Sequence, residues 1–134
     1  MKKKCVIIVE KANDGSYWCR TMNQINGKTM LTACGNSVKE AKEDLLCSLD
    51  EVKEYAAEEG KPLPDLEFEY RYDLQSFFSY FSYLNITEIA KRAEINPSLL
   101  RQYARGLSRA GEKTYERLTQ TITEIVNDLQ CVRF

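Results

Sequence analysis

The sequence contains no histidine, and this absence removes several kinds of chemistry at once. Without histidine the chain cannot build a Ser-His or Cys-His nucleophile pair, and it lacks the side chain that most often transfers protons near neutral pH. Glycine-rich phosphate loops are absent too, since neither GxGxxG nor GxxxxGK[ST] occurs. We therefore expect a protein that binds other molecules and is not an enzyme.

Long apolar runs are missing as well. After the basic residues 2–4, only the segment 5–9 is continuously apolar, and it is too short for a signal-peptide core or a membrane span. The five cysteines show no CxxC spacing: they stand at positions 5, 19, 34, 47 and 131. We therefore expect a cytoplasmic protein with reduced, mostly buried thiols, no metal site and no cofactor.

The charge is small in total and uneven along the chain. Of 134 residues, 19 are Lys or Arg and 20 are Asp or Glu, so the formal net charge is −1. Residues 1–73 carry 11 basic and 14 acidic side chains, whereas residues 74–134 carry 8 and 6. We expect two small domains over these two ranges, an acidic domain followed by a basic one.

The first half is predicted to form a sheet. Residues 5–9 are apolar and mostly β-branched, as in a central strand that is covered on both faces. Asn13-Asp14-Gly15 and Asn26-Gly27 are turn signals. The further strands expected from alternating or β-branched residues cover 17–22, 29–34 and 66–72.

One long helix is predicted within this half. Ser37 and Glu40 have the spacing of a capping box, in which the hydroxyl caps the helix and the glutamate reaches back. Apolar residues then recur at spacings of three and four up to Ala56, so the helix extends to about residue 59 and packs an apolar stripe on the sheet. Gly60 and the following prolines end it.

The second half is predicted to be helical. Aromatic residues at 77, 78 and 81 give a helix of 74–84 an apolar face, and apolar residues between 115 and 129 do the same for a helix of 112–129. Between them lie two short helices, at about 87–93 and 97–105, with Ile95 as the apolar residue of the turn. This pattern is typical of a helix-turn-helix that binds DNA.

The second short helix has well-marked ends and a polar face. Asn96 is a preferred N-cap, Pro97 suits the first helical turn, and Gly106 stops the helix. Its open face carries residue types that contact base edges and phosphates, within a stretch, 91–109, of five basic residues and one acidic residue. The residues predicted to bind DNA are Thr87, Arg92, Asn96, Ser98, Arg101, Gln102 and Arg105.

The order β-β-β-α-β followed by a helix-turn-helix carries a family resemblance. Three stretches match it: the strand at 6–9 with its Asp14-Gly15 turn, GNSVKEA at 35–41, and EEGKPLP at 58–64. Nearly the whole chain resembles HicB-type antitoxins, in which the first domain is a truncated RNase H-like sheet. Residues 22–28 depart from the family pattern, which often has a Leu-Pro-Gly-Cys-like segment before the third strand.

The resemblance implies a function. A HicB-type antitoxin binds and blocks a small HicA-like mRNA-cleaving toxin, which resembles a double-stranded-RNA-binding domain and uses a catalytic histidine, and it binds the operator of its own operon. Helix-turn-helix proteins commonly bind DNA as dimers. We therefore expect three partners: a HicA-like toxin, operator double-stranded DNA, and a second copy in a homodimer or higher homo-oligomer. The alternative is a stand-alone repressor whose N-terminal domain oligomerises or senses a ligand.

Individual residues allow other interpretations. Arg101 and Arg105 could pair with Glu94 or Glu112 instead of DNA. A two-metal nuclease, which the RNase H-like resemblance raises as an enzyme hypothesis, needs several converging carboxylates. The candidates are Glu10, Asp14, Glu67 and Glu69, although strand alternation assigns the last two to solvent.

Two surfaces could bind proteins. Tyr80 and Tyr83 could lie in a subunit interface, where tyrosine is enriched. The long helix has an acidic face that could steer a basic, RNA-binding partner towards it, although such faces are commonly only solvated. Its members are Glu40, Glu43, Asp44, Asp50, Glu51, Glu54, Glu58 and Glu59.

Overall fold

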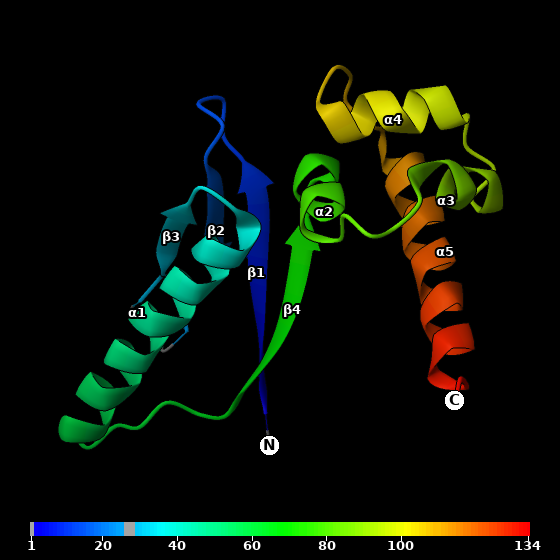
Figure 1. The fold of residues 1–134 in the computed structure, drawn as a ribbon. Coiled ribbons are helices and arrows are strands. Elements are labelled where there is room, and N and C mark those ends of the chain that lie inside the picture. Colours follow the sequence, from blue (N-terminus) through cyan, green and yellow to red (C-terminus); the bar gives the residue numbers. More distant parts are fainter. Residues whose placement is uncertain (1, 26–28) are drawn as a thin grey trace. The chain divides into compact units, whose positions relative to one another are not determined.

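The computed structural model describes residues 2–25 and 29–134. Among these residues it has one four-stranded mixed sheet and five helices, so the α+β class expected from the sequence is confirmed. The chain divides into two compact units, which we name unit 1 (Met1–Tyr80) and unit 2 (Phe81–Phe134) (Figure 1).

The sheet of unit 1 has the strand order β3-β2-β1-β4. Strand β1 (Lys3–Lys11) is central, as predicted: it pairs antiparallel with β2 (Tyr17–Thr21) and parallel with β4 (Leu66–Tyr72). Strand β3 (Thr32–Gly35) pairs antiparallel with β2 and begins three residues later than expected. The predicted Asn26-Gly27 turn lies outside the described residues.

Helix α1 (Val38–Glu58) connects β3 to β4 and covers one face of the sheet (Figure 1). The backbone N–H of Glu40 donates to the Ser37 hydroxyl at 3.1 Å, as the capping box predicts. The Glu40 carboxylate, however, accepts from the N–H of Asn36 at 2.8 Å, one residue before the cap. Apolar residues of α1 and β1 meet in the buried core: Val38, Ala41, Leu45 and Leu49 with Cys5, Ile7 and Val9.

Position 35, at the end of β3, has no room for a side chain, because the first turn of α1 lies against it. A Cβ atom on Gly35 would lie 2.6 Å from Cβ of Glu40 and 2.9 Å from the backbone nitrogen of Ala41. Both distances are shorter than van der Waals contact allows. The end of β3 can therefore approach the first turn of α1 closely only because residue 35 is glycine.

Helix α2 (Leu74–Tyr80) belongs to unit 1, whereas we predicted a domain boundary at 73/74 and a helix of 74–84 in the second domain. Asp73 explains the position of α2. Its carboxylate accepts from the backbone N–H of Ser76 at 2.7 Å and from the backbone N–H of Lys11 at 2.9 Å. One side chain thus caps the helix and attaches it to the end of β1.

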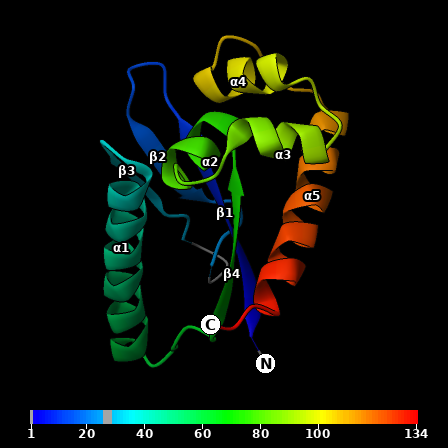
Figure 2. The same ribbon diagram turned by 45° about the vertical axis from the view of Figure 1, so that its right-hand side comes forward.

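Unit 2 consists of three helices among the residues described: α3 (Ile86–Arg92), α4 (Pro97–Arg105) and α5 (Glu112–Gln130). Figure 2 shows α3 and α4 following one another beside α5. These bounds differ by at most one residue from the predicted ones. Buried apolar residues come from all three helices and from the turn between α3 and α4: Ile89, Ala90, Ala93, Ile95, Leu100 and Leu118.

The expectation of mostly buried thiols is wrong. All five cysteines are free, and only Cys5 and Cys19 are buried, whereas Cys34, Cys47 and Cys131 are exposed. Strand alternation explains one of them, because Ala33 and not Cys34 faces the core. On α1, Cys47 lies outside the buried stripe.

Candidate nucleic-acid interface

The turn between α3 and α4 is short and tightly bonded. Ala93 ends α3, and the next residue, Glu94, has φ 59°, a left-handed conformation that is uncommon for residues other than glycine. The backbone N–H of Ile95 then donates to the Ala90 carbonyl at 2.8 Å. The Ile95 side chain is buried, as predicted for the apolar residue of the turn.

Helix α4 has the predicted ends. The Asn96 side chain accepts from the backbone N–H groups of Ser98 at 2.9 Å and Leu99 at 3.3 Å, so its amide oxygen is used for capping. Gly106 closes the helix with φ 77°. Leu100 is fully buried while Leu99 is 38% exposed, and this fixes which face of α4 is turned outward.

Three of the predicted DNA-binding residues come together at the start of these helices. Arg101 of α4 donates from Nη1 to the Thr87 hydroxyl of α3 at 2.8 Å and from Nη2 to the Ser98 hydroxyl at 3.2 Å. Arg101 is half-buried. The guanidinium is thus held in one position by two side chains from two helices.

The remaining polar residues of α4 are freer. Gln102 is exposed and accepts from the Ser108 hydroxyl at 3.4 Å. Arg105 is exposed, and no other described residue makes a hydrogen bond or ion pair with it. Neither Arg101 nor Arg105 forms a salt bridge with Glu94 or Glu112, so the described contacts do not support that alternative.

Arg92, also predicted to bind DNA, does not join Arg101, Thr87 and Ser98, because it pairs with a residue of α5. Its Nη2 lies 2.8 Å from a carboxylate oxygen of Asp128 on α5. Both side chains are well exposed, so the pair contributes little stability, but it points Arg92 towards α5.

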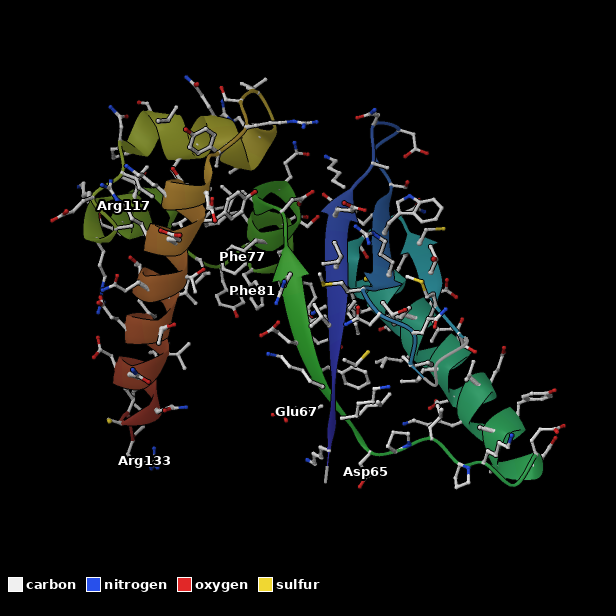
Figure 3. The ribbon with its side chains drawn as sticks, turned by 180° about the vertical axis from the view of Figure 1, so that it is seen from behind. Asp65, Glu67, Phe77, Phe81, Arg117 and Arg133 are labelled. Atoms are coloured by element: carbon white, nitrogen blue, oxygen red, sulfur yellow. The ribbon has the colours of Figure 1, made fainter. Side chains whose placement is uncertain are left out.

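Arg117 is a functional candidate that sequence reasoning missed. Its Nη1 donates to the backbone carbonyl of Glu94 at 3.3 Å and so attaches α5 to the turn (Figure 3). Nothing local in the sequence indicates this contact, because 23 positions separate the two residues. Arg117 adds a positive charge next to the stretch 91–109.

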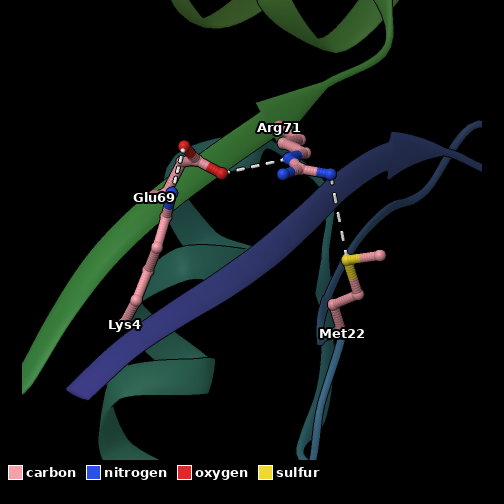
Figure 4. A network of polar contacts seen from close by, with 4 residues as sticks. All are labelled: Lys4, Met22, Glu69 and Arg71. Atoms are coloured by element: carbon pink, nitrogen blue, oxygen red, sulfur yellow. Dashed lines mark hydrogen bonds and ion pairs between the residues drawn. The ribbon is translucent and has the colours of Figure 1, made fainter.

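The carboxylates proposed for a nuclease do not form a metal site. Glu10 pairs with Arg20 at 3.3 Å. Glu69 pairs with Lys4 at 3.1 Å and Arg71 at 3.0 Å on the face of the sheet opposite α1 (Figure 4). Both hydrogen bonds lower the pKa of Glu69, and the one from Lys4 has the larger effect. The described residues contain no group of three side chains able to hold a metal ion.

The acidic face of α1 is solvated along its length. All eight carboxylates named above for this face are exposed. None of them belongs to a salt bridge among the described residues. Unit 1 therefore presents a row of exposed carboxylates along α1.

No helix in the described part of the chain is long and apolar enough to cross a membrane. Comparison of the chain with protein-family models, with curated proteins and with solved structures gave no match.

Proposed function

We propose that this chain is a cytoplasmic HicB-type antitoxin with two linked activities. Unit 1, a truncated RNase H-like domain in this proposal, binds and neutralises a HicA-like mRNA-cleaving toxin. Unit 2 acts as a helix-turn-helix that binds the operator of the chain's own operon and represses it. The observation that carries the proposal is the capped α4, which packs against α3 and exposes Gln102 and Arg105. The same chain carries the order β-β-β-α-β from β1 to β4.

The DNA-binding part is supported by the outward face of α4. Arg and Gln are the side chains that make paired contacts with guanine and adenine in the major groove. Arg105 and Gln102 are exposed in the second half of a helix whose opposite face buries Leu100. The basic residues within 91–109 supply the positive charge that phosphates attract.

The toxin-binding part is supported by the order of elements in unit 1 and by its charge. The order β-β-β-α-β, on which the family resemblance rests, is found in unit 1 from β1 to β4, and α2 follows it. The exposed carboxylates of α1 give this unit a negative face, and a protein that cleaves mRNA presents positive charge to its substrate. Opposite charges speed the association of two such proteins.

A second copy of the chain is also part of the proposal. Tyr80, one of the two tyrosines expected in a subunit interface, stacks on Tyr72 within unit 1 and remains 37% exposed. Helix α5 offers a better surface, because Val126 and Leu129 are 44% and 62% exposed and lie on the same face as Ile122. Apolar residues exposed in a row on a helix are typical of a pairing surface.

Co-expression tests the proposal most directly. The chain is produced together with the product of the small reading frame next to its gene, and we expect a stable complex and rescue of growth. The same protein is then used to select duplexes from a random pool, and we expect enrichment of a sequence found upstream of the operon. Selection of that duplex without complex or rescue would favour the stand-alone repressor. The absence of all three results would refute both functions.

A further inference from the structure

We propose that Thr87, Ser98 and Arg101 form one anion-binding cluster whose ligand is a backbone phosphate of nucleic acid. In this arrangement Arg101 anchors the protein on the duplex, and base recognition is left to Arg105 and Gln102. The inference rests on the proposed DNA-binding function and changes the role of Arg101 within it.

The cluster is built from two helices. Thr87 lies in the first turn of α3, and Ser98 lies in the first turn of α4, one turn before Arg101. The Arg101 guanidinium bridges the two hydroxyls, at 2.8 Å from Thr87 Oγ1 and 3.2 Å from Ser98 Oγ. Because α3 and α4 are packed together within one unit, the three side chains hold a fixed arrangement without a ligand.

Every polar group in the cluster has a proton left to donate. Each hydroxyl oxygen accepts a hydrogen bond from Arg101 and therefore keeps its own O–H proton for another acceptor. Within the described residues neither proton has an acceptor. The guanidinium has five N–H groups, of which two are used here. A ligand with several acceptor oxygens and a negative charge satisfies all of these groups.

No carboxylate among the described residues forms an ion pair with Arg101. Glu88 pairs with Lys91 at 3.5 Å, and Asp128 pairs with Arg92 at 2.8 Å. The amide oxygen of Asn96 is already used by the backbone at the start of α4. The cluster therefore keeps its positive charge, and a phosphate oxygen is the acceptor that DNA offers most often.

The same geometry argues against base recognition by Arg101. To make two parallel hydrogen bonds with guanine, the guanidinium needs to turn its edge into the groove. The bonds to Thr87 and Ser98 engage both terminal nitrogens of Arg101 and oppose this turn. Arg105 has no such bonds to the described residues and is exposed one turn further along α4.

Titration with inorganic phosphate tests the cluster without DNA. Amide NMR spectra are recorded at constant ionic strength for the wild type, for Thr87→Val and Arg101→Gln, and for Arg105→Gln as a matched control. We expect saturable shifts confined to residues near 87 and 98–101, abolished in the first two variants and kept in the control. Equal shifts in all four proteins, or none in the wild type, would overturn the cluster.

Duplex binding tests the source of the phosphate. Affinity is measured at several salt concentrations for a 30-base-pair duplex of mixed sequence and for the duplex that the wild type selects from a random pool. We expect Arg101→Gln to weaken both about tenfold and to reduce the salt slope by about one. Arg105→Gln instead reduces the preference for the selected duplex.

The outcomes separate the two proposals. If the wild type binds no duplex, the proposed DNA-binding function fails, whatever the phosphate titration gives. If it binds and selects a duplex but Arg101→Gln loses the preference while keeping affinity for mixed sequence, DNA binding stands and the anchoring role of Arg101 is wrong. Circular dichroism of each variant checks that unit 2 remains folded.

Discussion

The ammonium nitrogen of Lys42 lies 3.9 Å from the centre of the Tyr80 ring. It also lies 4.1 Å from the centre of the Tyr70 ring and donates to the Tyr72 hydroxyl. These side chains come from α1, β4 and α2, so one lysine connects three elements of unit 1. Burial lowers the pKa of Lys42, while the ring faces favour its charged form.

Removing this ammonium is expected to weaken unit 1. Lys42→Met keeps an unbranched side chain, one atom shorter, but loses the charged contact with the rings. We expect the free energy of unfolding to fall by about 1–2 kcal/mol. Urea unfolding followed by fluorescence of Trp18, the single tryptophan, measures the change. Lys39→Met, on an exposed position of the same helix, is the control. An unchanged midpoint for Lys42→Met would show that the rings do not hold the lysine.

The buried thiol of Cys19 is expected to make the folded protein less stable at alkaline pH. Burial raises the pKa of this thiol from 9.0 to about 11 in the folded protein. The folded pKa is the higher one, so the full stability is present below pH 9 and falls as the pH rises from about 9 to 11, because the unfolded thiol ionises first.

The urea midpoint under reducing conditions, measured at several pH values, checks this. Cys19→Ala is expected to be less stable at pH 7, since it leaves a small cavity, but to depend less on pH above 9. Cys47→Ala, which changes an exposed thiol, is expected to retain the wild-type dependence. If the urea midpoint of Cys19→Ala falls with pH as steeply as that of the wild type, the loss of stability does not come from the Cys19 thiol.

Replacing Ser76 by alanine is expected to stabilise unit 1. The Ser76 hydroxyl is fully buried in α2 and has no hydrogen-bond partner in the described part of the chain. An unsatisfied buried hydroxyl is costly, and alanine is the best helix former, so Ser76→Ala is expected to raise the free energy of unfolding by about 1 kcal/mol. Urea unfolding followed by Trp18 fluorescence measures this change in the free energy of unfolding. Ser79→Ala serves as comparison, because it removes the acceptor of the Tyr17 hydroxyl and is not expected to stabilise.

We predict that two copies of the chain pair through the exposed apolar residues of α5, Val126 and Leu129. Leu129→Lys places a charge in the exposed apolar row of α5, and we expect it to convert a dimer into a monomer in sedimentation experiments. Leu107→Lys changes a residue that is 71% exposed but lies in the loop after α4, and it is expected to leave the dimer intact. A wild type that is monomeric at all concentrations contradicts this use of α5.

The two proposed activities are expected to be separable. We expect Arg101→Ala to weaken operator binding about tenfold or more, because the proposed contact between this charge and the duplex is lost. The complex with the toxin should form as in the wild type, since Arg101 lies in unit 2. Gel-shift titration at fixed salt and co-purification with the toxin measure the two effects. Loss of both activities together would place Arg101 in a shared or purely structural role.

The predictions that were confirmed depend on local chemistry. Asn96, Pro97 and Gly106 define α4 because capping and left-handed backbone conformations are properties of a few adjacent residues. The spacing of Ser37 and Glu40 located the start of α1 in the same way. The apolar segment 5–9 indicated a central strand before any pairing was known.

The sequence by itself determined the elements of this protein, their order, and the set of polar residues around α4. Only the tertiary structure decided what each side chain meets, because these partners are far apart in the chain. It joined Arg101 to Thr87, directed Arg92 to Asp128, and attached α2 to β1 through Asp73. Local propensity fixes backbone conformation within a few residues, whereas the partner of a long polar side chain depends on how whole helices pack. For that reason the residues that bind nucleic acid in our proposal were found from the sequence, but their division into anchor and reader was not.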